Sequence, residues 1–156
     1  MAMNPRALGA LSALVLFFAC AAGSEPASPQ ESQVPAQIQI IEAEPLRGFL
    51  AQGGCVAVGK VLRVELFNQG TRGSRLRIHV EVEKQLEGSL PRQLSFLTWG
   101  GPADTKAGQQ LLFAARPPPP QAQDALLQSF FVIPAGKGEE AVQKQQEVLT
   151  KVKQAR

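Results

Sequence analysis

Residues 76–83 read Leu-Arg-Ile-His-Val-Glu-Val-Glu, and apolar and polar side chains alternate at every step of this stretch. A period of two places the four apolar side chains on one face of a β-strand and the four polar ones on the other. Such a strand buries one face and exposes the other, as strands of antiparallel sheets commonly do. The flanking segments then indicate which strands it pairs with.

A longer strand is expected over residues 55–67, where most even positions are apolar. Gly59 interrupts this pattern, and a glycine inside a strand commonly marks a bulge or a bend. The segment 68–74 holds two glycines and no large apolar residue, which is typical of a hairpin loop. The two strands should therefore pair antiparallel, and the second should end where residues 86–91 break the alternation.

Three shorter apolar strands are expected at residues 93–99, 110–115 and 130–133. Short helical turns are expected at residues 45–50 and within 122–128. Together with the first two, these segments give five strands, which is typical of a small β domain.

The segment Pro117–Pro120 has no backbone donors and favours an exposed polyproline II conformation. We interpret it as a stiff loop; the alternative is a site for a proline-reading partner. The best helix is expected at residues 138–155, with acidic residues at its start and basic residues at its end, as suits the helix dipole. Its apolar residues recur at three- and four-residue steps and should pack on the sheet.

Residues 1–19 have the order of an export signal, since Arg6 precedes an apolar run that ends at residue 19. This run is shorter than the ~20 residues that a membrane-spanning helix needs. The sequence Leu16-Phe17-Phe18-Ala19-Cys20 resembles the lipobox of bacterial lipoproteins, which implies that Cys20 becomes the lipidated N-terminus. The alternative is cleavage after Ala21, which would leave a soluble periplasmic or secreted protein.

Lipid chains on Cys20 would bind the protein to a membrane, because each buried methylene contributes ~0.8 kcal/mol. Ala21 in the second mature position resembles lipoproteins that are sorted to the outer rather than the inner membrane. Residues 20–37 contain three prolines and few large apolar side chains, so they are expected to form a disordered tether. A proline-stiffened tether could hold the folded domain, residues 38–156, up to ~50 Å from the membrane.

Five strands, a glycine-bent first strand and a terminal helix favour a mainly β, OB-like barrel. The local sequence resembles the netrin-like and metalloproteinase-inhibitor superfamily at three places: VAVGKV at 56–61, VEVEKQLEGSLP at 80–91 and GQQLLFA at 108–114. The resemblance implies a five-stranded OB barrel with a C-terminal helix. In the inhibitors, a disulfide-bonded N-terminal cysteine binds the protease zinc, whereas Cys20 would be lipidated and distant from the barrel. Protease inhibition by that mechanism is therefore not expected.

The candidate binding residues lie at two loops. Arg72, Arg75 and Arg77 cluster at the predicted hairpin, and Trp99 stands beside a Gly-Gly-Pro loop. The basic hairpin could contact anionic headgroups or a polysaccharide, or only keep that end soluble. An aromatic side chain beside a loop could anchor a protein partner, although it could equally be the edge of the core.

Few residues support catalysis or nucleic-acid binding. His79 is the only histidine, it has charged neighbours, and we expect it to be solvated. A zinc site normally draws on several His and Cys residues, so no metal site is indicated. The only aspartates, Asp104 and Asp124, lie in predicted loops, and no cofactor site or small-molecule substrate is indicated either. The net charge of +3 is spread along the chain and tyrosine is absent, unlike a nucleic-acid groove. Cys55 is expected to be a small buried residue; the alternative is a reactive or intermolecular thiol.

These patterns predict a membrane-anchored lipoprotein of the cell envelope whose domain binds another envelope protein without catalysis. The alternative is a soluble exported inhibitor or ligand-binding domain of OB type.

Overall fold

The computed structural model describes residues 36–67, 75–99 and 105–155. The predicted signal, Cys20, most of the tether and Arg72 lie outside the described residues. The elements follow in the order α1 (Ala43–Ala51), β1 (Cys55–Phe67), β2 (Arg75–Glu87), β3 (Gln93–Trp99), β4 (Gln110–Arg116), β5 (Leu126–Ile133) and α2 (Gly138–Gln154). None of the helices in these ranges is long and apolar enough to cross a membrane.

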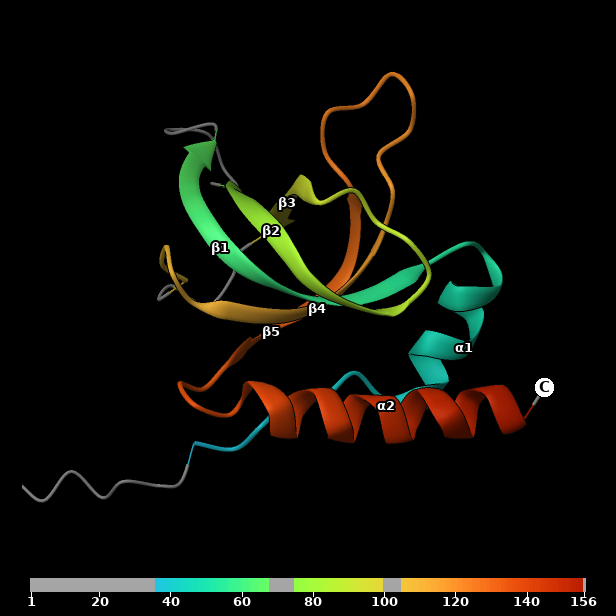
Figure 1. The fold of residues 1–156 in the computed structure, drawn as a ribbon. Helices are drawn as coiled ribbons and strands as arrows, with labels where there is room; N and C mark the ends of the chain where they lie inside the picture. The colour runs from blue at the N-terminus through green and yellow to red at the C-terminus, as the bar shows by residue number, and fades with distance from the viewer. Residues whose placement is uncertain (1–35, 68–74, 100–104, 156) are drawn as a thin grey trace, which may run out of the picture. The chain divides into compact units, whose positions relative to one another are not determined.

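The five strands form one antiparallel sheet in the order β3-β2-β1-β4-β5. The first three strands are a meander, and β4 returns to lie beside β1, which is a Greek-key arrangement. Figure 1 shows the strongly curved sheet, with α2 lying along one side of it and α1 beside α2. The mainly β fold with a five-stranded sheet and a C-terminal helix is therefore confirmed.

Several predicted boundaries agree with the structure and others do not, among them the start of β5, which is at Leu126 and not at residue 130. The bounds of β1 and β3 are those predicted, but β2 continues beyond the expected break as far as Glu87. The helical turn expected within 122–128 is wrong, because Leu126 and Leu127 already pair with β4. Tertiary pairing decides their conformation here, which a local pattern does not reveal.

Gly59 bends β1, as predicted. The register between β1 and β2 shifts at Val58 and Gly59. A Cβ atom at Gly59 would lie 2.8 Å from the backbone oxygen of Glu81 on β2, closer than real side chains approach. Only glycine therefore allows the two strands to come together at this bend.

Each side of the sheet has its own apolar core. On the inner side, the ring of Phe96 lies 5.5 Å from that of Phe113 and 6.0 Å from that of Phe130. On the outer side, α1 and α2 cover β1 and β4 through residues such as Leu46 and Leu149. Because β1 and β4 are covered on both sides, their sequences have long apolar runs.

The two edge strands approach each other without closing the sheet into a barrel. A single parallel bridge joins Phe96 of β3 to Ala125, just before β5. The amide of Ala125 donates a hydrogen bond of 2.7 Å to the backbone oxygen of Ser95. The preceding segment, Pro117–Pro120, forms a mostly exposed loop without helix or strand, as predicted.

One buried amide holds the N-terminal segment against α2. Gln145 is completely buried, and its side chain bonds to both backbone groups of Ile41. The oxygen accepts from the Ile41 N–H at 2.8 Å, and the nitrogen donates to the Ile41 carbonyl at 3.1 Å.

Candidate binding groove

A groove lies where α2 begins. Strand pairing places Lys60, Gln110 and Ile133 in one row across β1, β4 and β5. A Cβ atom at Gly138, the first residue of α2, would lie 2.6 Å from the side-chain oxygen of Gln110, so the helix starts against this row. From there α2 runs toward Glu87, which its Lys153 contacts. The row therefore lies at the end of the helix and is left partly uncovered.

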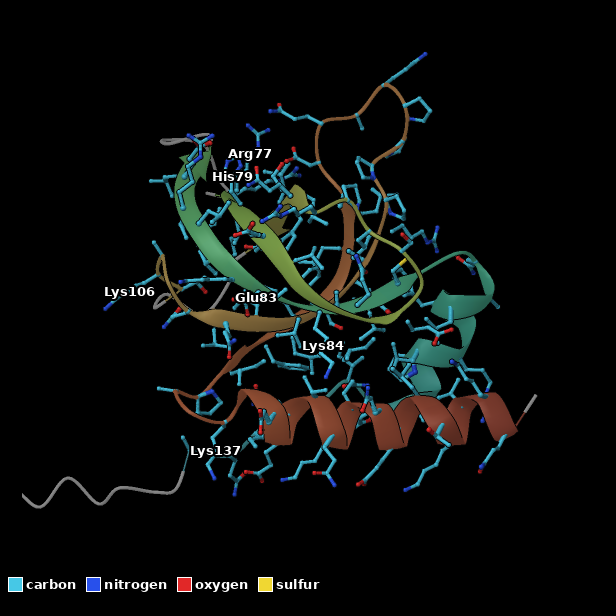
Figure 2. All side chains as sticks on the ribbon, in the orientation of Figure 1. Arg77, His79, Glu83, Lys84, Lys106 and Lys137 are labelled. Atoms are coloured by element: carbon cyan, nitrogen blue, oxygen red, sulfur yellow. The ribbon has the colours of Figure 1, made fainter. Side chains whose placement is uncertain are left out.

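Two adjoining cavities form the groove, and both are lined by Glu83 and Gln110. The first, of about 700 Å³, lies between α2 and the sheet and is also lined by Val58, Lys84, Gly136, Gly138, Glu139, Val142, Gln143 and Gln146. The second, of about 670 Å³, is also lined by Lys60, the turn of residues 106–109 and residues 132–135. Figure 2 shows Lys84 between the sheet and α2, with Glu83 near β4 and Lys106 farther along the sheet.

Three lysines of the groove, Lys60, Lys84 and Lys106, are exposed. Within the described part of the chain, none of them has a carboxylate within ion-pair distance. Their ammonium groups are therefore available to a bound anion.

The neighbouring carboxylates are partly occupied. One oxygen of Glu83 accepts a hydrogen bond of 2.7 Å from the side-chain nitrogen of Gln110. Glu81, which faces Lys60 across the β1–β2 pair, is bound instead by Arg92 at 3.0 Å. Glu139 remains as a groove carboxylate without an ion-pair partner among the described residues.

Two other lysines near the start of α2 differ from the groove lysines, because they are paired with an acid. Glu140 contacts Lys137 at 3.0 Å and Lys144 at 2.9 Å. Hydrogen bonds from Lys144 and then Lys137 lower the pKa of the Glu140 carboxyl. These two lysines are therefore engaged by an acid, unlike Lys84.

Hydrogen bonds hold the turn that carries Lys106 in place. The Lys106 N–H donates to the side-chain oxygen of Gln109 at 2.8 Å. Gly108, at a φ of 90°, donates its N–H to the carbonyl of Val61 at 2.8 Å. A positive φ of this size favours glycine, so the turn is fixed onto β1 in one conformation.

The predicted basic hairpin is only partly described. Arg75 and Trp99 are backbone partners on β2 and β3, so the sheet brings these two predicted residues together. Arg77 lies two positions along β2, but its guanidinium holds both oxygens of Asp124 at 3.0 and 3.1 Å. The exposed fractions of the two side chains are only 17% and 16%. Arg77 therefore holds the segment that leads into β5.

Asp124 also binds Ser95. The Ser95 hydroxyl donates to Asp124 at 2.6 Å, beside the bridge that joins β3 to Ala125. Asp124 thus links β2 and β3 to the end of the 117–125 loop. Because this hydroxyl is committed to Asp124, Ser95 does not form a nucleophile–base pair with a histidine.

His79 is more covered than predicted, with a side chain that is only 17% exposed. Its Nε2 lies 3.2 Å from a carboxylate oxygen of Glu65, although the contact is not aligned as a hydrogen bond. Contact with His79 is the main cause that lowers the pKa of Glu65; desolvation opposes it, and the charge of Arg63 adds a smaller lowering. Among residues 36–67, 75–99 and 105–155, no group of three His, Cys, Asp or Glu side chains could hold a metal ion.

Cys55 is a small buried residue, one of the two readings of the sequence. It is free and 4% exposed, and its sulfur lies 3.6 Å from the carbonyl of Ser89. Gly88, at a φ of 72°, packs directly on it, because a Cβ atom there would lie 2.5 Å from the sulfur. The thiol is therefore enclosed by the turn after β2.

No protein-family model matches the chain, and neither does any curated protein. The case for function therefore depends on the site itself.

Sequence reasoning missed the groove lysines. Lys60 offered a signal, because it stands among apolar residues at an even position of the 55–67 strand, on the face expected to be buried. Lys84 and Lys106 carry no such signal, since each lies at the end of a pattern where lysine is ordinary. Their proximity depends on the pairing of β1 with both β2 and β4, which local periodicity does not report.

Proposed function

We propose that this protein is a lipoprotein of the cell envelope whose folded domain binds another envelope protein without catalysing a reaction. The observation that carries the binding role is the groove at the start of α2. It combines an apolar floor with lysines that have no acidic partner among the described residues. Apolar surface with a few placed charges is what a specific partner site requires.

We assign the domain to the OB type and, more finely, to a netrin-like form of it. The Greek-key strand order and the single bridge between the edge strands support this assignment, since OB domains are five-stranded and partly open barrels. The C-terminal helix on the outer side agrees with the netrin-like resemblance.

The anchoring role depends on the lipobox-like sequence that ends at Cys20. In this proposal, lipid on Cys20 holds the protein on the outer membrane, and the tether of residues 20–37 presents the domain. Gln145 supports such an arrangement, because it fixes the chain at Ile41, close to the end of that tether. A pull on the tether would then act on α2 through a buried contact.

Metabolic labelling with a radioactive fatty acid tests the anchor. We expect label in the membrane fraction of the wild type and none in Cys20→Ser, while Cys55→Ser, a matched control, stays labelled. An unlabelled wild type would contradict the lipoprotein assignment and favour a free exported domain.

Photo-crosslinking in intact cells tests the binding role. A photoreactive residue at Gln143, on the wall of the groove, should capture one discrete envelope protein. The same residue at Thr150, on the exposed surface of α2, is the control. If neither position, nor others scanned over the domain, captures a discrete protein, the binding role is wrong.

A further inference from the structure

We infer that the groove binds an extended protein segment that places a carboxylate between Lys60 and Lys106 and an adjacent apolar side chain on the floor formed by residues 132–135. This inference rests on the proposed protein-binding function and names the chemistry of the partner. The argument has three parts, which concern charge, the apolar floor and the rigidity of the site.

The charge of the second cavity favours an anionic partner. Lys60 and Lys106 both line it, and neither meets a carboxylate among the described residues. Of the two acids that flank Lys60, Glu81 is paired with Arg92, whereas Glu83 accepts a hydrogen bond from the neutral Gln110 and keeps its charge, so the cavity has two lysines against one carboxylate. A carboxylate would complement this end of the groove, whereas a basic segment would be repelled.

The floor of the same cavity argues against a simple inorganic anion. Its exposed apolar surface comes from Pro134, Ala135 and Ala107, beside the buried Ile133, whereas Val132 also packs against the inner core. A phosphate ion or a small acid would leave this apolar surface in contact with water. An apolar side chain beside the carboxylate covers the surface and gains the free energy of its burial.

The first cavity suits the continuation of a peptide chain. It adjoins the second at Glu83 and Gln110, and its wall presents the side-chain amides of Gln143 and Gln146. Amide groups both donate and accept hydrogen bonds, so they can serve the backbone of an extended segment. The partner is therefore a length of chain rather than a single residue.

The cationic end of the groove is preformed. The turn that carries Lys106 is held by Gln109 and by the bond from Gly108 to Val61, and Lys60 lies within the paired part of β1. Little backbone order has to be gained on binding, which reduces the entropic cost of association.

Selection from a random heptapeptide library on the full-length protein in detergent tests the inference. We expect enrichment of peptides that carry Asp or Glu beside an apolar residue. One arm displays peptides with a free C-terminus and the other with a blocked one. Enrichment in the first arm alone would identify a terminal carboxylate as the ligand, and enrichment in both a side-chain carboxylate.

Charge reversal then locates the site. The best synthetic peptide should bind Lys60→Glu and Lys106→Glu about 10-fold or more weakly than the wild type, as expected for loss of a charged hydrogen bond. Lys151→Glu makes the same charge change on an exposed part of α2 and should leave the affinity within about 2-fold, the change expected of a rim charge. Enrichment in the blocked arm of peptides without excess acids, or equal binding by all variants, would overturn the inference.

Crosslinking in cells distinguishes a failure of this inference from a failure of the binding function on which it rests. If the Gln143 crosslinker captures the same envelope protein from wild type, Lys60→Glu and Lys106→Glu, the binding function stands and the acidic segment is wrong. If peptides bind with the expected charge dependence but no position captures a discrete protein in cells, the groove chemistry stands and the proposed binding function is wrong.

Discussion

The side chain of Gln145 forms two hydrogen bonds with the backbone N–H and C=O of Ile41, 104 positions away. It thus satisfies the two backbone groups that a neighbouring strand would pair with in a sheet. The amide offers one acceptor and one donor, as a strand residue does with its own backbone. The segment before α1 is thereby fixed to α2 although it belongs to no sheet.

Gln145→Leu should destabilise the domain by about 1–3 kcal/mol, because it leaves the buried N–H and C=O of Ile41 unsatisfied. Urea unfolding measures the change, and hydrogen exchange at the Ile41 amide should accelerate. Gln146→Leu, one position along on an exposed site, is the control and should change stability by less than about 0.5 kcal/mol. A Gln145→Leu variant as stable as the control would show that the hydrogen bonds between Gln145 and Ile41 contribute nothing to stability.

Arg77→Met should lower the free energy of unfolding by about 1.5–3 kcal/mol, since it leaves the largely buried carboxylate of Asp124 without its charged donor. Asp124→Asn and the double variant complete a thermodynamic cycle. We expect a coupling energy above about 1 kcal/mol, compared with about 0–0.5 kcal/mol for the exposed pair of Arg92 with Glu81. Equal coupling in the two cycles would mean that Asp124 does not hold the loop.

Glu65→Gln should reduce the loss of stability in acid. The folded-state pKa of Glu65 lies below its ordinary value of 4.5, so its ionised form is favoured in the native state. That stabilisation is complete above the unfolded pKa and is lost as the pH falls through the lower, folded value. Urea unfolding followed from pH 6 down to about pH 3 should therefore give a shallower acid decline in the variant. An unchanged slope would exclude a contribution from the contact with His79.

Two glycine substitutions should have opposite effects. Gly59→Ala places a methyl group 2.8 Å from the backbone oxygen of Glu81 and should cost about 1–3 kcal/mol by overpacking. Gly48→Ala adds a methyl group within α1, where no atom lies within 4 Å, and should stabilise the protein by up to about 1 kcal/mol. Thermal unfolding distinguishes the two. A neutral Gly59→Ala would show that β1 and β2 can separate at the bend.

The sequence patterns predicted the elements better than their assembly. The bounds of β1 and β3 followed from alternation and from turn residues, both of which are local. The start of β5 was missed because Leu126 and Leu127 show no period, and only their pairing with β4 makes them a strand. Gln145 occupies a position of the apolar stripe of α2, but a polar residue there does not reveal which backbone it will serve.

The candidate site was predicted less well than the fold. Arg75 and Trp99 were predicted at two separate loops, and the strand register makes them backbone partners. Arg77 looked like a surface cation, yet a single aspartate from a distant loop occupies it. The groove lysines come together through the pairing of β1 with β2 and β4 and through the position at which α2 begins.

The contact of Gly138 with Gln110 fixes where α2 begins, and the start of α2 determines how much of the groove is left uncovered. One helical turn advances ~5.4 Å, similar to the ~6.6 Å between successive side chains on one face of a strand. If α2 started one turn earlier, it would cover the row of Lys60, Gln110 and Ile133. If it started one turn later, the next row of the sheet would also be uncovered. Changes confined to residues 134–137 would therefore alter the size of the groove while both apolar cores stay as they are.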